Sequence, residues 1–349
     1  MTALANAIKK VATGPHLSKD LTFQETQEAI TEILSGQADP VQAAIFFISL
    51  RIKRETNEEN LGVYAALQAV TKQVEADVDQ LLLIADPFNG FNRHCPINAF
   101  LPAVLAASGL PTVSHGVEEM GPKFGVTHSQ VLSEAGINTS LTTGQAKDRI
   151  NQTDIGWAYL DQAQASPALF ALQDLRTRMI KRPSLATLEK MVLAIKAKQK
   201  THLQIGFVHK AYPDILAWMA NHAGFDSALI IRGIEGGVLP TLREAANCFQ
   251  SYTEIAEGCT IDPNSFGIKQ ETRGVLPIAS NEVTASETLE LGRQALDGKV
   301  GPAFDSLVYG TALALWHCRL SSSQAEAANH ARQAIKSGKA KAHFQAAVS

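Results

Sequence analysis

The sequence predicts an α/β protein with a small discontinuous helical lobe and a larger α/β lobe built on a mainly parallel central sheet. Three observations lead to this fold class. Only helical patterns occur in the first 75 residues, short apolar runs alternate with helical stretches from about residue 80, and a strand-free helical stretch interrupts that alternation. Alternating strands and helices are typical of a parallel sheet flanked by helices.

Three N-terminal helices are predicted from the capping and stop residues at their ends. One runs through DLTFQETQEAITEILSG and stops at Gly36, a glycine that suits a helix C-terminus. Helices this short are stable only when they pack on other elements, so they are expected to form part of a lobe. The capping residues are Asp20 or Thr22 for the first helix, Asp39 before Pro40 for the second, and Thr56 with Glu59, a capping box, for the third.

The strand–helix alternation comes in two stretches. The first reads LLLIA, INAFLPAVLAASG, PTVSHG and HSQVLSEAGI, and the second reads HLQIGFVH, PDILAWMANHAG, SALIIRGIEGG and PTLREAANC, in each case strand, helix, strand, helix. The segment between them is helical in pattern, as is the C-terminal tail. The expected units are residues 1–75 for the first part of the helical lobe, 76–165 for the first part of the α/β lobe, 166–200 for the hinge and second part of the helical lobe, and 201–349 for the rest of the α/β lobe.

Composition excludes several classes of protein. The chain has 349 residues, is 45% hydrophobic, and carries Lys+Arg 31 against Asp+Glu 34, so no global basic field indicates nucleic acid. Its four cysteines lie far apart without CxxC spacing, which is typical of a reducing compartment and not of a disulfide framework or zinc site. No stretch approaches 18 consecutive apolar residues. A cytoplasmic chain without membrane contact is expected.

The order of segments resembles a known family. LTFQETQEAITEILSGQADPVQAAIFFISL is similar to the N-terminal helical segment of anthranilate phosphoribosyltransferases and related nucleoside-phosphorylase-type enzymes. VSHGVEEMGPKFG, the hinge segment with two arginines, QIGFVHKAYPDILAWM and GPAFDSLVYGTALALW continue the resemblance over nearly the whole chain. The resemblance implies a cleft between the lobes, with phosphoribosyl pyrophosphate at the C-terminal ends of strands and an aromatic amine entering from the helical side. It also implies a cytoplasmic glycosyl or pentosyl transferase related to tryptophan biosynthesis.

The loop DPFNGFNRHCP stands where the family has a glycine-rich pyrophosphate loop. Counting back without gaps from His115-Gly116, the family's Gly-Thr-Gly-Gly-Asp falls on Pro87, Phe88, Asn89, Gly90 and Phe91. Glycine serves such loops because backbone N–H groups must approach phosphate oxygens closely. Proline has no N–H to donate, and two phenylalanines obstruct that approach. The sequence therefore predicts a remodelled phosphate loop.

Two further departures agree with this interpretation. The lysine that precedes His-Gly in the family is Ser114 here, and the Asp-Glu pair that holds magnesium is Leu239-Pro240. Magnesium needs oxygen ligands, usually one or two carboxylates, and the nearby Glu235 is a poor replacement. No metal ligand is predicted, and magnesium is expected only if phosphoribosyl pyrophosphate is bound.

A set of residues is nevertheless suited to an anionic ligand in the cleft. Arg93 and His94 can bind an anion through their side chains, or the loop can be a surface feature whose phenylalanines fill the cleft. Arg176 and Arg182 keep the spacing of the two hinge arginines, although most arginines are solvated or cap a helix. The candidate ligand-binding residues are Asn89, Gly90, Asn92, Arg93, His94, His115, Gly116, Lys123, Arg176 and Arg182. No catalytic residue is assigned.

The segment from Arg176 to Lys210 is locally basic. It contains nine Lys or Arg residues against the single acid Glu189. A charge run is usually a solvated helix face, but two copies in a dimer can line a groove for nucleic acid. A homodimer through the helical lobe is expected from the apolar density of Val41–Leu50. Two functions therefore stay open: a transferase with altered or lost donor binding, and a non-catalytic paralogue that binds an anionic ligand or nucleic acid.

Overall fold

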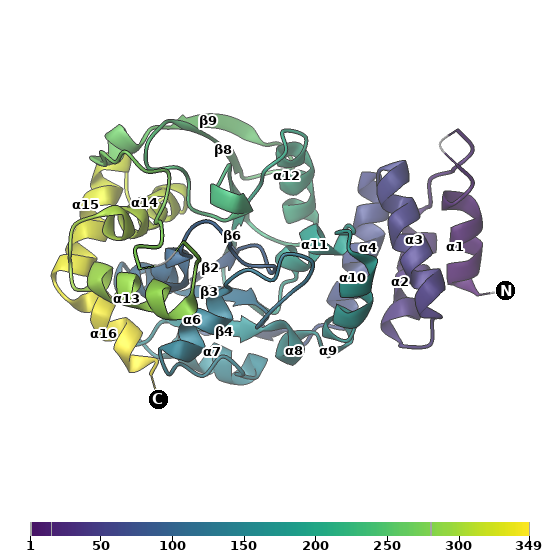
Figure 1. Cartoon of the computed structure of the whole chain (residues 1–349), viewed down its shortest axis with the longest axis horizontal. Coiled ribbons are helices and arrows are strands. Elements are labelled where there is room, and N and C mark those ends of the chain that lie inside the picture. Colours follow the sequence, from purple (N-terminus) through teal and green to yellow (C-terminus); the bar gives the residue numbers. More distant parts are fainter. Residues whose placement is uncertain (1, 15, 280, 349) are drawn as a thin grey trace.

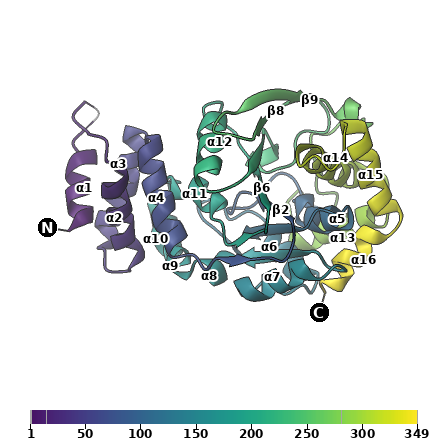
Figure 2. The ribbon, with the colours of Figure 1, turned by 180° about the vertical axis from the view of Figure 1, so that it is seen from behind.

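In the computed structural model, which describes residues 2–14, 16–279 and 281–348, the chain forms two lobes (Figure 1). The N-terminal helices lie at one end of the molecule, and the helices of the C-terminal tail lie at the other end, beyond the sheet. The view from behind shows the same separation (Figure 2). No helix in the described part of the chain is both long enough and apolar enough to cross a lipid bilayer.

Four helices begin the helical lobe: α1 (Ala3–Val11), α2 (Phe23–Leu34), α3 (Pro40–Lys53) and α4 (Asn57–Ala69). The predicted caps are confirmed. Thr22 caps α2, Asp39 accepts hydrogen bonds from the first turn of α3, and Thr56 and Glu59 form the capping box of α4. Glu59 is fully buried and also accepts the Leu21 N–H at 2.9 Å, so this cap ties α4 to the segment that precedes α2.

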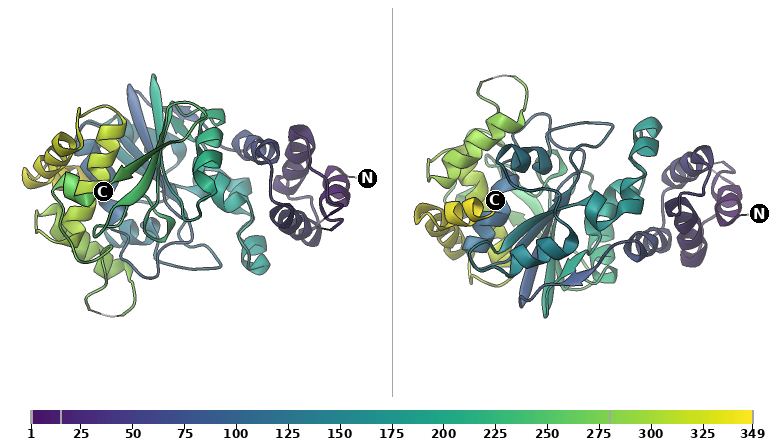
Figure 3. Two further views of the ribbon diagram at one scale, coloured as in Figure 1. Left: turned by 90° about the horizontal axis from the view of Figure 1, so that it is seen from above. Right: turned by 90° about the horizontal axis from the view of Figure 1, so that it is seen from below.

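The hinge segment returns to this lobe, as predicted. After α8 (Gln162–Ala165), it comprises α9 (Pro167–Phe170), α10 (Gln173–Met179), α11 (Leu185–Leu188) and the 3-10 turn η2 (Glu189–Met191). Helix α10 packs on α3, and α11 packs on α4. Figure 3 shows these helices between the N-terminal bundle and the sheet. The helical lobe is therefore discontinuous in sequence.

The large lobe is built on a seven-stranded sheet of order β4-β3-β2-β6-β7-β8-β9. Its first five strands are parallel: β4 (Trp157–Asp161), β3 (Thr112–Gly116), β2 (Gln80–Ala85), β6 (Lys200–Gly206) and β7 (Ser227–Ile231). The last two, β8 (Ala246–Ser251) and β9 (Glu257–Ile261), are antiparallel. The 3-10 turns η3 (Ile234–Gly236) and η4 (Pro263–Phe266) follow β7 and β9.

Helices cover both faces of the sheet, which explains why its strands read as continuous apolar runs. In β2, Leu82 and Ile84 join the core under the C-terminal helices, whereas Leu81 and Leu83 join the core towards the helical lobe. The first face carries η1 (Ile97–Phe100), α5 (Leu101–Ala107), α6 (His128–Glu134), α13 (Ala285–Leu296), α14 (Pro302–His317), α15 (Gln324–Lys336) and α16 (Lys339–Ala346). The second face carries α7 (Thr143–Asn151) and α12 (Tyr212–His222).

Two local predictions are wrong. PTLREAANC is not a helix, because residues 242–244 form a bend and residues 246–251 form the antiparallel strand β8. The hinge segment is also not strand-free, because β5 (Ile195–Lys196) pairs with β1 (Val74–Glu75) in a separate two-stranded sheet. The β1–β5 pairing joins segments distant in sequence, which local patterns do not report. Strand β8 was missed although its partner β9 follows it directly in the chain.

Candidate functional site

The candidate site lies at the carboxyl ends of β2, β3, β6 and β7, where open α/β sheets bind ligands. The loop 86–95 follows β2, and a second loop, 117–126, follows β3. The two loops are held together by the bridge between Phe91 and Val126. Gly90 has φ 71°, and a Cβ there would come within 2.2 Å of the Gly125 carbonyl oxygen, so this close approach requires glycine.

The loop after β2 already binds a carboxylate, that of Glu235. The backbone N–H groups of Arg93 and His94 donate to its Oε1 at 3.0 Å each, and the N–H of Asn92 donates to its Oε2 at 3.1 Å. The imidazole Nδ1 of His94 lies 3.3 Å from Oε1. Three successive amides converging on one anion form the kind of concavity that holds phosphates in other proteins. The loop thus keeps backbone anion binding, whereas side-chain binding alone had been expected.

Lys123 completes the surroundings of this carboxylate. Its ammonium donates to Glu235 Oε2 at 2.6 Å and to the Gly90 carbonyl at 2.6 Å. Burial by itself would raise the pKa of Glu235, but hydrogen bonds from His94 and Lys123 hold that pKa well below its usual value. Burial also lowers the pKa of Lys123, Glu235 opposes the change, and the positive charges of Arg182 and Arg93 reinforce it. All three cations therefore share one electrostatic environment.

The turn after β7 delivers Glu235 into the loop. Glu235 has φ 53°, a left-handed conformation that is costly for a residue with a side chain. A Cβ on Gly233 would come within 1.7 Å of the Gly237 carbonyl oxygen, so the turn is too tight for any other residue there. Asp86 fixes the far side of the turn, because its Oδ1 accepts the Val238 N–H at 3.0 Å. Strain at this position is balanced by the contacts of the carboxylate.

The two phenylalanines of the loop are buried within the site. Phe88 is 5% exposed and packs with Val117 and Met120, and its ring meets His115 edge-on at 5.2 Å. Phe91 is 4% exposed and stacks on His128. These rings occupy interior volume next to the loop, and the interpretation of a filled cleft stays a prediction.

Leu239 and Pro240, which the resemblance places at the magnesium motif, carry apolar side chains. Leu239 is buried, and its side chain packs closely on Gly310 of α14: a Cβ at position 310 would come within 2.5 Å of Leu239 Cδ2. Pro240 follows it within the core. Across residues 2–14, 16–279 and 281–348, no three His, Cys, Asp or Glu side chains are placed to hold a metal ion. The side chains of Leu239 and Pro240 therefore supply no ligand for a magnesium ion.

The two hinge arginines lie in different environments. Arg176 is 4% exposed and forms a bidentate ion pair with Glu189, at 2.6 and 2.7 Å. Gln162 donates to the same carboxylate at 3.0 Å. Helix α10 ends at Met179, so a break separates Arg176 from the exposed Arg182. Anion binding by these two arginines stays a prediction, in which Arg182 is the accessible partner.

A buried amine lies beneath the loops. Lys190 is 8% exposed, and its ammonium lies 3.3 Å from the Gly206 carbonyl at the end of β6. Burial lowers the pKa of this amine to about 8, although the charges of Asp86 and Glu189 act in the opposite direction. The Lys190 carbonyl lies 3.1 Å from His115 Nε2, and burial lowers the pKa of His115 to about 4. A neutral imidazole thus fixes the backbone that carries the amine.

Most of the sequence-predicted residues meet at this edge of the sheet. Asn89 is buried and its carbonyl accepts the Gly125 N–H, while Gly116 ends β3 beside the Tyr159 hydroxyl. Glu235 and Lys190 were not predicted as site residues. An acid one residue before a Gly-Gly pair signals a tight turn, which could have drawn attention to Glu235, whereas nothing local marks Lys190 as buried.

Comparison with known proteins agrees with this architecture. Residues 5–70 match the helical bundle domain of a glycosyl transferase family, and residues 92–341 match the a/b domain of that family. An uncharacterized protein of Aquifex aeolicus is 26% identical over 320 residues, covering 90% of this chain and 94% of its own length. Anthranilate phosphoribosyltransferase of Acetivibrio thermocellus is 26% identical over 345 residues, covering 97% and 93%.

Solved structures share the fold. Anthranilate phosphoribosyltransferase from Thermus thermophilus superposes with a TM-score of 0.80 at 17% identity, covering 100% of this chain and 98% of that one. The Saccharomyces cerevisiae enzyme in complex with PRPP and Mg superposes with a TM-score of 0.78 at 15% identity, covering 99% and 97%. At this level of identity the likeness establishes the fold only.

Proposed function

Because this chain belongs to the glycosyl transferase family whose helical-bundle and a/b domains it matches, we propose that it keeps the family's cleft as an anion-binding site without transferring phosphoribosyl groups. One observation carries this proposal. The backbone amides of residues 92–94, which directly follow the five positions aligned with the pyrophosphate loop, are occupied by the Glu235 carboxylate, and Lys123 neutralises it. A pyrophosphate would have to displace an internal ion pair and then bind without a carboxylate pair for magnesium.

The exposed rim of the cleft supports a polyanionic ligand, with single-stranded nucleic acid as the proposed class. The side chain of Arg93 is 76% exposed, and Arg182 is exposed on the hinge. Lys210 is exposed in the segment after β6, where Val208 faces the 233–237 turn. These cations come from three different segments, and two of them, Arg93 and Arg182, act on the pKa of Lys123 at the loop. A phosphodiester backbone is recognised by such distributed positive charges.

The test compares two ligands. Isothermal titration with phosphoribosyl pyrophosphate and magnesium is expected to give no saturable heat, whereas a single-stranded DNA oligonucleotide binds more weakly as salt rises. Arg93→Ala and Arg182→Ala each reduce the slope of log K against log salt by about 0.7, the value for one lost phosphate contact on a single strand. Lys336→Ala, on the exposed end of α15, is the matched control and leaves the slope unchanged. Equal slopes in all four proteins would contradict the proposal.

A transferase with an altered donor is the second candidate function. It is favoured by the anthranilate phosphoribosyltransferases among the relatives and by the buried Lys190 amine at the carboxyl edge of the sheet. Anthranilate-dependent release of pyrophosphate from phosphoribosyl pyrophosphate would support this candidate. Saturable binding of the donor together with such turnover would overturn the non-catalytic proposal.

The proposed assembly is a homodimer through the helical lobe. In α3, Phe46, Phe47 and Leu50 are buried within the lobe, whereas Val41 and Ile45 remain 62% and 43% exposed. An apolar stripe on an otherwise packed helix is typical of an interface. A cytoplasmic location belongs to the same proposal, since all four cysteines are free.

A further inference from the structure

A second pocket lies at the amino edge of the parallel strands, opposite the candidate site. Strand β8 is antiparallel to β7 and places Ser251 beside Ala228, at the start of β7, so Tyr252 emerges at that edge. The pocket has a volume of about 460 Å³, within the range of small-molecule sites. It is lined by Gln250 and Tyr252 from the end of β8, and by Trp316, Arg319, Leu320, Ser321, Ser322 and Glu326 from α14, α15 and the turn between them.

Arg319 occupies a position that ordinarily favours glycine. Helix α14 ends at His317, and the N–H groups of Arg319 and Leu320 donate back to the carbonyls of Trp316 and Leu315 at 3.2 and 2.9 Å. This is the Schellman arrangement, whose left-handed residue is usually glycine. Arg319 takes that conformation with φ 61°. Strain of this kind points to a role for the side chain.

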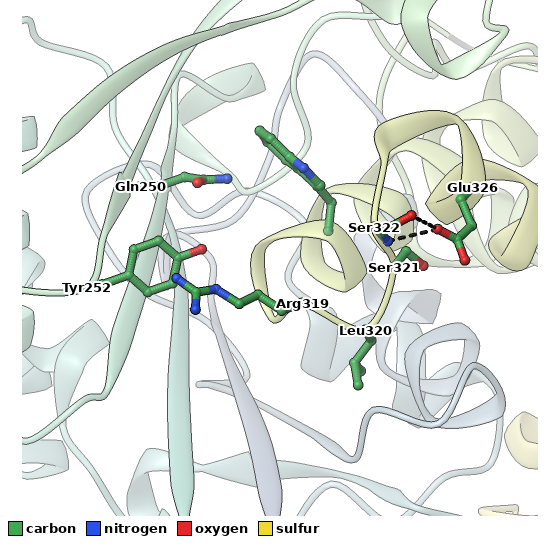
Figure 4. Close-up of a pocket in the computed structure, with 8 residues that line it drawn as sticks. Gln250, Tyr252, Arg319, Leu320, Ser321, Ser322 and Glu326 are labelled. Atoms are coloured by element: carbon green, nitrogen blue, oxygen red, sulfur yellow. Dashed lines mark hydrogen bonds between the residues drawn. The ribbon is translucent and has the colours of Figure 1, made fainter.

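The Arg319 guanidinium is held at the pocket without a carboxylate partner. It lies over the Tyr252 ring, 4.7 Å from the centroid, as Figure 4 shows. In the described parts of the chain, no carboxylate lies within ion-pair distance of this guanidinium. A cation that rests on an aromatic face keeps most of its hydrogen-bonding capacity for a ligand.

The remaining lining residues combine a rigid aromatic wall with polar groups. The Tyr252 hydroxyl donates to the His317 carbonyl at 2.9 Å, and the two rings stack 5.1 Å apart, so the tyrosine is fixed. Trp316 is half-buried and Gln250 offers a carboxamide. The hydroxyl of Ser321, a residue 7% exposed, has no hydrogen-bond partner among the described residues. A buried hydroxyl without a partner is unfavourable unless water or a ligand supplies one.

We propose that this pocket binds a small planar aromatic ring that carries an anionic group, with the size and chemistry of a nucleoside monophosphate. The anion contacts Arg319, and the ring lies along Trp316 and the edge of Tyr252, whose ring faces already meet His317 and Arg319. The Gln250 carboxamide supplies a donor and an acceptor for the edge of the ligand ring. Glu326, which Ser322 orients at 2.8 Å through its N–H, places negative charge on the opposite side of the pocket (Figure 4). With Arg319 positive and Glu326 negative, the anionic group of the ligand is expected to face Arg319.

Arg319→Gly is a clean perturbation. It deletes the guanidinium, and glycine suits the left-handed conformation, so the helix end and the fold are preserved. Adenosine 5′-monophosphate is the probe, and Trp316 is the reporter, because it lines the pocket. Saturable quenching of tryptophan fluorescence is expected with a dissociation constant below about 1 mM. In Arg319→Gly the affinity falls at least about tenfold while the unfolding temperature stays equal or rises.

Control ligands test the phosphate and the aromatic ring separately, and a control variant shows which tryptophan gives the signal. Adenosine, which lacks the anion, and ribose 5-phosphate, which lacks the ring, each bind more weakly than the monophosphate. Trp316→Phe removes the fluorescence change, and calorimetry still detects binding. A 5′-phosphorylated oligoadenylate is titrated in parallel: tighter binding of the oligomer assigns the pocket to strand ends, and tighter binding of the monomer assigns it to a free ligand.

Two results would overturn the inference. One is the absence of saturable binding of the monophosphate in both fluorescence and calorimetry. The other is equal affinity in the wild type and Arg319→Gly. Neither depends on the cleft, because Arg93→Ala and Glu235→Ala leave this pocket intact, so failure here is distinguishable from failure of the proposed cleft function.

Discussion

Replacing Glu235 by alanine removes the internal anion from the loop after β2. In the wild-type protein this carboxylate accepts three backbone N–H groups at 3.0–3.1 Å and the Lys123 ammonium at 2.6 Å, and its side chain is only 2% exposed. Alanine and glutamate face the same backbone cost at φ 53°. The loss of stability in Glu235→Ala therefore measures the contribution of the carboxylate and not that of the backbone conformation of the turn.

The expected loss of unfolding free energy is about 3 kcal/mol. A hydrogen bond to a charged group contributes about 1.5–3 kcal/mol, and removal of one partner of a buried ion pair costs about 3–5 kcal/mol. The lower end applies here, because Asn92 and Arg93 are exposed and water can reach their amides, and because Lys123 keeps the Gly90 carbonyl as an acceptor.

Two measurements check this value. Chemical denaturation gives the global loss, and amide hydrogen exchange of residues 92–94 reports the loop directly. Glu235→Gln is the matched control, because it keeps an acceptor oxygen of the same reach and loses only the charge, so about half of the loss is expected. Inorganic phosphate should restore amide protection in Glu235→Ala and leave the wild type unchanged, since only the variant has free loop amides.

A loss below about 1 kcal/mol with unchanged exchange at residues 92–94 would refute the assignment of Glu235 as the anion that organises the loop. Protection restored equally by phosphate and by chloride would show that the vacated loop has no preference for a phosphate-like ligand.

Three further outcomes are expected. Ile45→Asp on the exposed stripe of α3 converts a dimer to a monomer in light scattering, and a wild-type protein that is monomeric at micromolar concentration would reject the dimer. Arg176→Ala leaves Glu189 buried without its partner and destabilises the fold by about 3–5 kcal/mol, so an unchanged denaturation midpoint would show that this pair contributes nothing. Burial lowers the pKa of His202 to about 4 and of His317 to about 3, whereas a histidine of the unfolded chain has a pKa of about 6.5, so below pH 6.5 the unfolded chain binds more protons than the folded one. The free energy of unfolding should therefore fall as pH drops from 6.5 towards 4, by up to about 1.4 kcal/mol per pH unit for each histidine. A free energy of unfolding that stays constant in that window would contradict the buried neutral histidines.

Much of the fold was predictable because its signals are local. Caps such as Thr56 with Glu59 satisfy amides within one turn, and apolar runs such as Leu81–Ala85 have the length of a buried strand. The strand β8 was missed because its sequence alone does not favour a strand over a helix, and only its pairing with β7 and β9 makes it a strand.

The sequence by itself determined that Pro87 offers no backbone N–H and that Leu239-Pro240 offers no carboxylate, whatever the fold. That these positions are the family's phosphate loop and metal pair stays a prediction. Only the tertiary structure decided what fills the loop. Glu235 lies more than a hundred residues from His94, and a left-handed turn between glycines brings its carboxylate onto the three amides. Likewise, Arg176 pairs with Glu189 and Arg319 rests on Tyr252 through contacts between separate elements. Charges in a sequence give a list of donors and acceptors, but the pairing among them depends on distance and burial, which only the folded chain sets.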